Sequence, residues 1–169
     1  MPEKTINKEL HDNGVIIRRC DLLSPLAQEL IAALNAELAS RYPEEGANHF
    51  RLDPHEVAEG NGAFLIALQE DKPIGCGAVR RIEERSAELK RMYVAPTARG
   101  LGVGRALLTA LEAEARALGL TRLLLETGTR QQEALGLYRQ AGFTEIPTYG
   151  EYVGSPLSIC FAKTITNHS

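Results

Sequence analysis

Hydrophobic positions in the first part of the chain change from a strand pattern to a helical one. Residues 15–19 (VIIRR) form a short β-branched run that is typical of a strand. Ser24 and Pro25 then place an N-cap residue before a proline, which is favoured at the first position of a helix. Apolar residues recur at helical spacing from Leu26 to Leu38. We therefore predict a strand followed by an amphipathic helix.

The residues from 40 to 62 break this periodicity with proline, glycine, asparagine, histidine and charge. This composition predicts a loop, with a short helical turn near residues 55–58. Three extended runs follow at 63–69, 74–82 and 87–94, separated by short charged turns. Because short links usually join antiparallel neighbours, we predict that these three strands pair in antiparallel fashion.

The second half of the chain alternates between helical and extended patterns. A loop rich in glycine at residues 96–104 leads into an apolar stripe from Leu107 to Leu118, and Gly119 follows it. This pattern predicts a helix with a glycine C-cap. Residues 122–127 are mostly apolar without alternation, which predicts a central strand covered on both faces.

The last part of the chain predicts one more helix and two strands. Apolar residues share one helical face between residues 129 and 141, and Gly142 is placed to end this helix. Extended runs at 143–146 and 157–163 predict the final strands, with a turn-rich segment between them.

Together these elements predict an α/β fold with a mixed, mostly antiparallel central sheet of six or seven strands flanked by helices. The expected order is β-α-α-β-β-β-α-β-α-β-β. No repeat or linker divides the chain, so we expect one domain over residues 1–169. Residues 1–13 and 165–169 are expected to be mobile ends.

Charge and cysteine content narrow the classes of function. The chain has 19 Lys and Arg residues against 22 Asp and Glu residues, a net charge of -3, which argues against a nucleic-acid binder. The sequence has neither a signal peptide nor a run of about 20 apolar residues, so no membrane association is expected. Cys20, Cys76 and Cys160 are widely spaced, which favours free thiols and a cytoplasmic protein over a disulfide framework or a metal site.

A glycine-rich loop lies between a predicted strand and a predicted helix. Its sequence is Arg99-Gly100-Leu101-Gly102-Val103-Gly104-Arg105. Backbone N–H groups and the positive end of the helix dipole favour an anion at such a place. The spacing matches neither a dinucleotide-binding loop nor a P-loop. The alternative is a loop whose glycines only permit a tight turn.

Two motifs carry a family resemblance. The pattern Arg99-x-x-Gly102-x-Gly104 resembles the Q/R-x-x-G-x-G/A pyrophosphate loop of the GCN5-related N-acetyltransferase (GNAT) superfamily. Residues 134–143 (ALGLYRQAGF) resemble the later A-x-x-L-Y-x-x-x-G-F signature of that superfamily. The order of the elements also matches, so the resemblance covers the chain from Val15 to Lys163.

The resemblance implies acetyl-CoA as the cofactor. Its pyrophosphate would be held by the glycine loop, and its pantetheine arm would pair with the end of the strand before the loop. That strand is expected to separate there from the strand that ends at Thr127. Gln131 stands where many relatives have asparagine, and we name it as a candidate contact. The expected cofactor-binding residues are Met92, Tyr93, Val94, Arg99, Gly100, Leu101, Gly102, Val103, Gly104, Arg105, Thr127 and Gln131.

Two residues are candidates for the chemistry. An amine with a pKa near about 10 must lose a proton before it attacks. Glu88 stands where many members of the superfamily carry a catalytic glutamate, and its alternative role is an ion pair with Arg80 or Arg81. The resemblance makes Tyr138 the general acid for the leaving thiolate, and its alternative role is that of a core tyrosine.

The resemblance therefore implies an N-acetyltransferase that acts on a primary amine, by direct transfer in a ternary complex. The alternative is a catalytically silent module that binds or senses acyl-CoA. The small size of the chain favours a small-molecule amine as the partner, and the resemblance adds a possible homodimer. An amino acid, a polyamine, an aminoglycoside and a protein amine all remain open as acceptors.

Loop residues offer candidates for acceptor binding. Five acids either attract a cationic amine or are simply solvated. Tyr149 and Tyr152 either line a small-molecule site or anchor the terminal hairpin. The five acids are Glu44, Glu45, Asp53, Glu56 and Glu59.

Overall fold

The computed structural model describes residues 8–10, 14–44 and 52–165. The predicted mobile ends lie outside these described residues except at two places, where the structure differs from the prediction. Residues Lys8–Leu10 form a short strand, β1, which pairs with β2 (Val15–Arg19). Ile165 is buried, and its N–H donates to the carbonyl of Thr121 over 2.8 Å.

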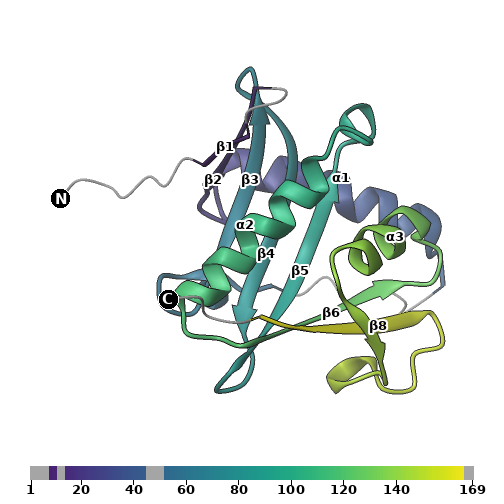
Figure 1. Cartoon of the computed structure of the whole chain (residues 1–169). Helices are drawn as coiled ribbons and strands as arrows, with labels where there is room; N and C mark the ends of the chain where they lie inside the picture. Colours follow the sequence, from purple (N-terminus) through teal and green to yellow (C-terminus); the bar gives the residue numbers. More distant parts are fainter. Residues whose placement is uncertain (1–7, 11–13, 45–51, 166–169) are drawn as a thin grey trace.

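One sheet of eight strands forms the centre of the molecule, in the order β1-β2-β3-β4-β5-β6-β8-β7 (Figure 1). Only β5 and β6 pair in parallel among the neighbouring strands of the described chain. This arrangement confirms the predicted mixed, mostly antiparallel sheet, and β1 is the strand that the sequence did not signal. The remaining strands are β3 (Gly62–Gln69), β4 (Lys72–Arg81), β5 (Ser86–Val94), β6 (Arg122–Gly128), β7 (Thr144–Ile146) and β8 (Ser158–Thr164).

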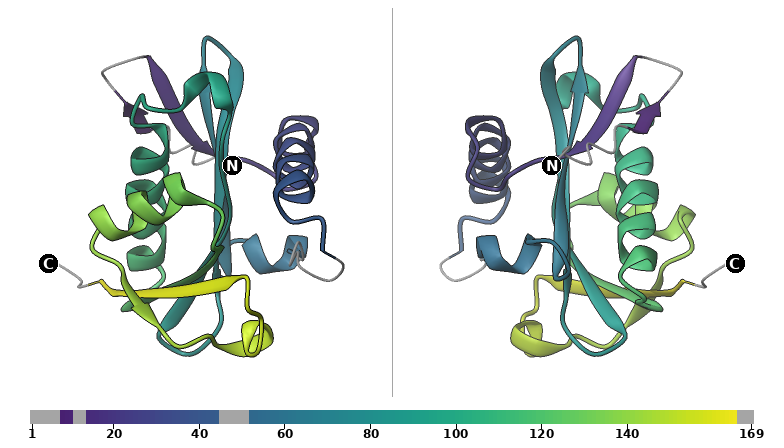
Figure 2. Two further views of the ribbon diagram at one scale, coloured as in Figure 1. Left: turned by 90° about the vertical axis from the view of Figure 1, so that its right-hand side faces the viewer. Right: turned by 90° about the vertical axis from the view of Figure 1, so that its left-hand side faces the viewer.

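Three helices cover the two faces of the sheet. Helix α1 (Pro25–Arg41) lies on one face, and α2 (Val103–Ala117) and α3 (Gln132–Gln140) lie on the other (Figure 2). Ser24 caps α1 as predicted, because its hydroxyl accepts the N–H of Ala27 over 3.3 Å. Each face of the sheet has its own apolar core, one with α1 and one with α2 and α3. The short helical turns are η1 (Pro54–Val57), η2 (Pro96–Ala98) and η3 (Gly150–Tyr152).

Helix α3 begins later than the sequence predicts. The helical pattern starts at residue 129, but the first helical residue is Gln132. The N–H of Thr129 still donates to the carbonyl of Leu157 over 3.0 Å, which continues the contact with the neighbouring segment. Gln131 has a non-helical backbone, with φ -99 and ψ 72. The sheet contact therefore overrides the local helical pattern for the first three residues.

A β-bulge interrupts β5 beside β4. Cys76 pairs with Tyr93 and Ala78 pairs with Lys90, so Gly77 alone faces two residues, Arg91 and Met92. Arg91 has a φ of 59, the left-handed conformation that non-glycine residues rarely adopt. The sulfhydryl of Cys76 donates to the carbonyl of Arg91 over 3.2 Å. The bulge changes which side chains of β5 face α1.

The parallel pair of β5 and β6 is short. Their register runs only from Ser86 opposite Arg122 to Leu89 opposite Leu125, although both strands continue. Beyond this point β6 and β8 diverge from β5 (Figure 1). The expected separation of the two strands is therefore present, and it opens the sheet between the glycine loop and α1.

Candidate active site

Two adjoining cavities lie where β5 and β6 separate. The larger, about 530 Å³, runs along the glycine loop between the end of β5, α2 and α3. The smaller, about 90 Å³, lies between β5, β6 and the C-terminal half of α1. Four residues line both cavities, so the two form one continuous cleft across the sheet. These residues are Leu34, Met92, Gln131 and Tyr138.

The glycine loop presents backbone donors to the larger cavity. Gly100 and Gly102 have φ values of 81 and 82, and no described atom lies within 4 Å of a Cβ built at either position. Backbone conformation, not crowding, therefore requires glycine at these positions. Gly102 is the N-cap of α2, and no described side chain caps this helix. The first N–H groups of α2 are thus open to an anion.

The arginines beside the loop contribute less charge than the sequence suggests. Arg99 donates through Nε to the carbonyl of Val94 over 2.9 Å, and its guanidinium pairs with Glu37 of α1. Its charge is therefore balanced, and the side chain ties the loop to α1. Arg105 also lines the larger cavity, and its side chain is exposed. The groups of this loop that are open to an anion are therefore the backbone N–H groups and the guanidinium of Arg105.

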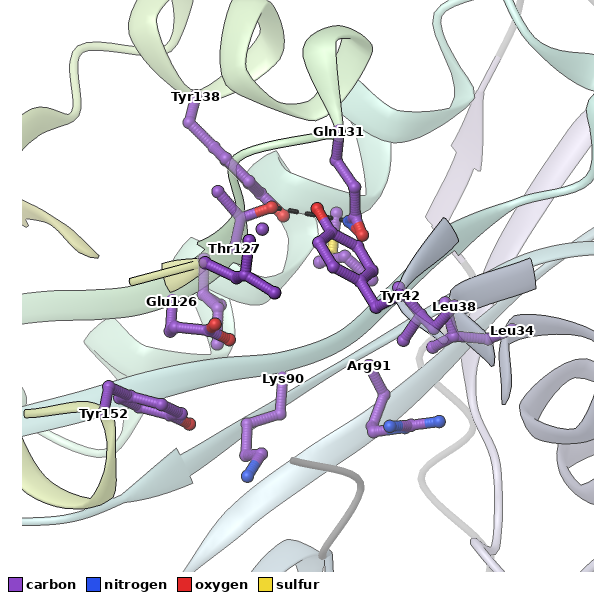
Figure 3. Close-up of a pocket in the computed structure, with 14 residues that line it drawn as sticks. Leu34, Leu38, Tyr42, Lys90, Arg91, Glu126, Thr127, Gln131, Tyr138 and Tyr152 are labelled. Carbon is purple, nitrogen blue, oxygen red and sulfur yellow. Dashed lines mark hydrogen bonds between the residues drawn. The ribbon is translucent and has the colours of Figure 1, made fainter. Parts of the chain in front are cut away.

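Polar groups for an extended ligand line the gap between β5 and β6. The N–H of Ala95 donates to Ile74 of β4 over 2.8 Å, so the N–H of Val94 is directed to the opposite edge, toward the gap. Gln131 donates through Nε2 to Thr127 Oγ1 over 3.4 Å. Its Oε1 is buried and accepts no hydrogen bond from any residue that the structure describes. Figure 3 shows Gln131 and Thr127 together at the cavity wall.

These features fit the acetyl-CoA that the sequence leads us to expect. The loop offers donors for a diphosphate, and Gln131 Oε1 offers an acceptor for an amide N–H. All the expected cofactor residues except Leu101 line one of the two cavities. The side chain of Leu101 is 48% exposed. Tyr93 lines the larger cavity and packs in the core under α1.

Glu88 is the most buried charged group beside the cleft, only 1% exposed. Its Oε1 accepts hydrogen bonds from Arg80 Nε over 3.0 Å and from Nη2 over 2.7 Å. Its Oε2 accepts the hydroxyls of Tyr149 over 2.6 Å and Tyr152 over 3.0 Å. The ion pair with Arg80 that the sequence raised as an alternative is therefore present. Of the two tyrosines, Tyr152 lines the smaller cavity.

The two tyrosines were not recognised in the sequence as partners of Glu88. They lie 61 and 64 residues from it, in a turn-rich segment whose local pattern gives no sign of this contact. Burial and then the charge of Glu88 raise the pKa of both hydroxyls. Both tyrosines therefore keep their protons and act as donors to the carboxylate.

Tyr138 lies at the junction of the two cavities. It is 5% exposed and packs edge-to-face on Phe143, with ring centroids 5.8 Å apart. Both roles weighed from the sequence are thus compatible with its position, because the ring belongs to the core and the residue lines both cavities. Burial, and then the charge of Glu126, raise the pKa of its hydroxyl. The phenol remains protonated at neutral pH.

Of the five acids expected to attract a cationic amine, two form ion pairs with arginines and one lies outside the described residues. Glu44 pairs with Arg130, and Glu56 pairs with Arg80. Glu45 lies outside the described residues. The negative charges of Glu44 and Glu56 are therefore already balanced by arginines and offer little attraction to a cationic acceptor.

Tyr42, just after α1, closes one end of the smaller cavity. Its hydroxyl accepts the N–H of Arg130 over 2.7 Å, and the guanidinium of Arg130 lies 5.2 Å from the centre of its ring. A Cβ at Gly128 would lie 1.9 Å from this hydroxyl. The end of β6 therefore accepts only glycine at residue 128 while Tyr42 keeps its place.

We expect Gly128→Ala to destabilise the protein by about 1–3 kcal/mol, because Tyr42 must move and lose its bond to Arg130. Thermal unfolding should show a midpoint lowered by about 3–8 °C. Gly136→Ala is the matched control, because no described atom lies within 4 Å of a Cβ there and the residue is inside α3. The thermal midpoint of this control should be unchanged or higher than that of the native chain. Equal midpoints for the two variants would contradict the close packing of Tyr42 on Gly128.

The described residues contain no group of three or more His, Cys, Asp or Glu side chains placed to hold a metal ion. Within the same ranges, none of the helices is both long enough and apolar enough to cross a bilayer. Cys20, Cys76 and Cys160 are free, and burial raises the pKa of the Cys76 thiol to about 12. Cys76 is thus an inert core thiol.

Comparisons with known proteins agree with this geometry. Residues 27–143 match the acetyltransferase (GNAT) family. A protein named IAA acetyltransferase from Azospirillum brasilense is 41% identical over 153 residues, which cover 90% of this chain and 99% of the relative.

Solved structures share the fold. A proposed acyl-CoA N-acyltransferase from Klebsiella pneumoniae subsp. pneumoniae MGH 78578 superposes with a TM-score of 0.77 at 31% identity, over 90% of this chain and 98% of the other. A GNAT family acetyltransferase from Elizabethkingia anophelis, solved with acetyl-CoA bound, gives a TM-score of 0.64 at 19% identity, over 91% and 99% of the two chains.

Proposed function

The chain belongs to the acetyltransferase (GNAT) family, and from this premise we propose that it transfers an acetyl group from acetyl-CoA to a primary amine of a small molecule. The chain is thus an acyltransferase, and acetyl-CoA is its acyl donor. The observation that carries the proposal is the continuous cleft. It joins the glycine loop to a pocket that contains Tyr138 and Tyr152, the latter bonded to Glu88.

Acetyl-CoA supplies the acetyl group on a thioester, from which the sulfur departs as a thiolate. The N–H groups of the loop from Gly100 to Gly104 would hold the diphosphate, and Gln131 Oε1 would accept a pantetheine amide. The N–H of Val94, directed into the gap, would donate to the thioester carbonyl. These contacts would bring the reacting carbon beside the smaller cavity, where an amine would attack directly in a ternary complex.

Glu88 is proposed to take the proton of the amine through Tyr152. Because Glu88 is 1% exposed, a direct contact with the acceptor is disfavoured. The hydroxyl oxygen of Tyr152 accepts a proton from the amine nitrogen while its own proton passes to Glu88 Oε2, 3.0 Å away. Arg80 fixes the other carboxylate oxygen. The amine nitrogen is thereby freed to form the new bond to carbon.

Tyr138 is proposed to give its proton to the departing thiolate. Tyr138→Phe should lower kcat about 10- to 100-fold and leave CoA affinity unchanged, because only the proton donor is lost. The raised pKa of Tyr138 keeps the acid protonated as pH rises, so the native rate should show no decline between about pH 7 and pH 10. An unchanged kcat in the variant would assign Tyr138 to the core alone.

The smaller cavity supports a small-molecule acceptor. Its volume of about 90 Å³ and its enclosure by α1, β5 and Tyr152 favour a compact amine over a protein chain. Release of CoA thiol from acetyl-CoA against a panel of primary amines tests the proposal, with CoA binding measured by calorimetry. Release that depends on an amine supports it. CoA binding without release for any amine contradicts transfer and favours an acyl-CoA sensor.

The cytoplasm is the proposed location, supported by three free cysteines, among them the buried Cys76 and Cys160. A homodimer stays a prediction from the family. Light scattering of the purified chain measures its mass directly, and 18.5 kDa is the value for one chain.

A further inference from the structure

The bulge in β5 turns two successive cations to one face of the sheet. Side chains of consecutive residues in a regular strand point to opposite faces. Here Arg91, in its left-handed conformation, points to the same side as Lys90, and its Nη2 donates to Asn35 of α1. Figure 3 shows both side chains extending from β5 to one side, opposite Tyr138 and Gln131. Both residues line the smaller cavity.

The ammonium of Lys90 lies in an environment that lacks a direct partner. Lys90 is 7% exposed, and its Nζ makes no hydrogen bond within the described part of the chain. Burial lowers its pKa, and the nearby charge of Glu88 opposes this effect. The oxygens of Glu88, however, already accept four hydrogen bonds from Arg80, Tyr149 and Tyr152. A buried ammonium of this kind is costly unless a ligand pairs with it.

Apolar side chains from two segments also line the cavity. Leu34 and Leu38 come from α1, and Leu157 comes from the segment before β8. The carboxylate in this lining is Glu126, and one of its oxygens accepts the hydroxyl of Ser158 over 2.7 Å. The cavity therefore combines two cations and one carboxylate with a group of leucine side chains. This charge balance disfavours polyamines and aminoglycosides, which carry several positive charges.

We infer that the acceptor is a small amino carboxylate with an apolar side chain. Its carboxylate pairs with Lys90 and Arg91, and its side chain contacts the leucines. Its amine is directed to Tyr152. This inference rests on the proposed function, because it names the acceptor class of the same site. Arg91 keeps its strained conformation as part of this recognition, since the bulge is what brings the second cation to the cavity.

Matched acceptors test the inference. Leucine and phenylalanine are compared with 3-methylbutylamine and 2-phenylethylamine, the same molecules without the carboxylate. We expect kcat/KM for the amino acids to exceed that of the amines by at least about 30-fold, because the amines lack the carboxylate that pairs with the buried ammonium of Lys90. Amines that react as well as the amino acids would overturn the inference and leave the proposed function standing.

Lys90→Met removes the charge and keeps most of the apolar stem, so the fold should tolerate it. We expect it to lower kcat/KM for leucine at least about 30-fold more than it lowers that for 3-methylbutylamine. Lys72→Met is the matched control, because Lys72 is exposed at the start of β4. Its kinetics should equal those of the native chain. A Lys90 variant that keeps the preference for leucine would overturn the inference.

A binding measurement separates recognition from turnover. Calorimetric titration of N-acetyl-leucine into the complex with CoA should show binding that Lys90→Met weakens and Lys72→Met does not. N-acetyl-3-methylbutylamine, which lacks the carboxylate, should bind the native chain weakly. Equal binding of the two compounds would overturn the inference without reference to catalysis. Loss of acetyl transfer to every acceptor, with CoA still bound, would instead overturn the proposed function and the inference with it.

Discussion

Glu88→Gln is expected to lower kcat for amine acetylation by about 100-fold or more while CoA affinity stays the same. The amide has the shape of the carboxylate, and its oxygen still accepts a hydrogen bond from Tyr149 or Tyr152. It has no basic oxygen to receive the proton that Tyr152 passes on. The rate of CoA thiol release measures kcat, and calorimetry measures CoA affinity.

The variant also removes the charge that faces Arg80, so a loss of stability must be separated from a loss of chemistry. Glu112→Gln is the matched control. Glu112 is 8% exposed on α2 and pairs with Lys163 over 2.6 Å, outside the lining of both cavities formed by the described residues. Both variants break a buried ion pair and should lower the thermal midpoint. Only Glu88→Gln should lower kcat.

Retained turnover in Glu88→Gln would identify Glu88 as a structural partner of Arg80. The same result would remove Tyr152 from the proton route, because its hydroxyl would have no acceptor for its own proton. Tyr138 would then be the remaining proton-transfer residue of the cleft. The transfer of acetyl groups itself would be unaffected by that outcome.

The order of the strands and helices follows from periodicity, because each main element buries one apolar face or stripe. The sequence predicted the helices and the seven strands from β2 to β8 for this reason. It did not predict β1, whose three residues have no apolar repeat, or the bulge at Arg91. A left-handed residue is signalled by glycine, asparagine or aspartate, and arginine gives no such signal. Tertiary pairing with β4 fixes that conformation instead.

The candidate site likewise has parts that the sequence predicted and parts that it did not. The glycine loop was visible because its chemistry is local, with the donors, the glycines and the helix start adjacent in sequence. The partners of Glu88 could not be predicted from the sequence, because Tyr149 and Tyr152 reach it from the segment between β7 and β8. Lys90 and Arg91 would be assigned to opposite faces by strand alternation. The bulge alone brings them together, so acceptor recognition needed the structure.

Gly102→Val is expected to weaken CoA binding by about 100-fold. Gly102 lines the larger cavity with a φ of 82, and a β-branched residue is strongly disfavoured there. The loop must either keep this strain or rotate its backbone, and rotation turns the first N–H groups of α2 away from the cleft. The new side chain also stands at the place of the diphosphate. Calorimetric titration with CoA measures the loss.

Gly119→Val separates this effect from strain alone. Gly119 follows α2 at its C-terminal end with a φ of 79, and no described atom lies within 4 Å of a Cβ there either. Both substitutions therefore impose a similar strain of about 1–2 kcal/mol and should lower the thermal midpoint alike. Only Gly102→Val changes the donors at the start of the helix. Equal losses of CoA affinity in the two variants would mean that backbone strain alone causes the loss. The backbone of the loop would then not hold the diphosphate.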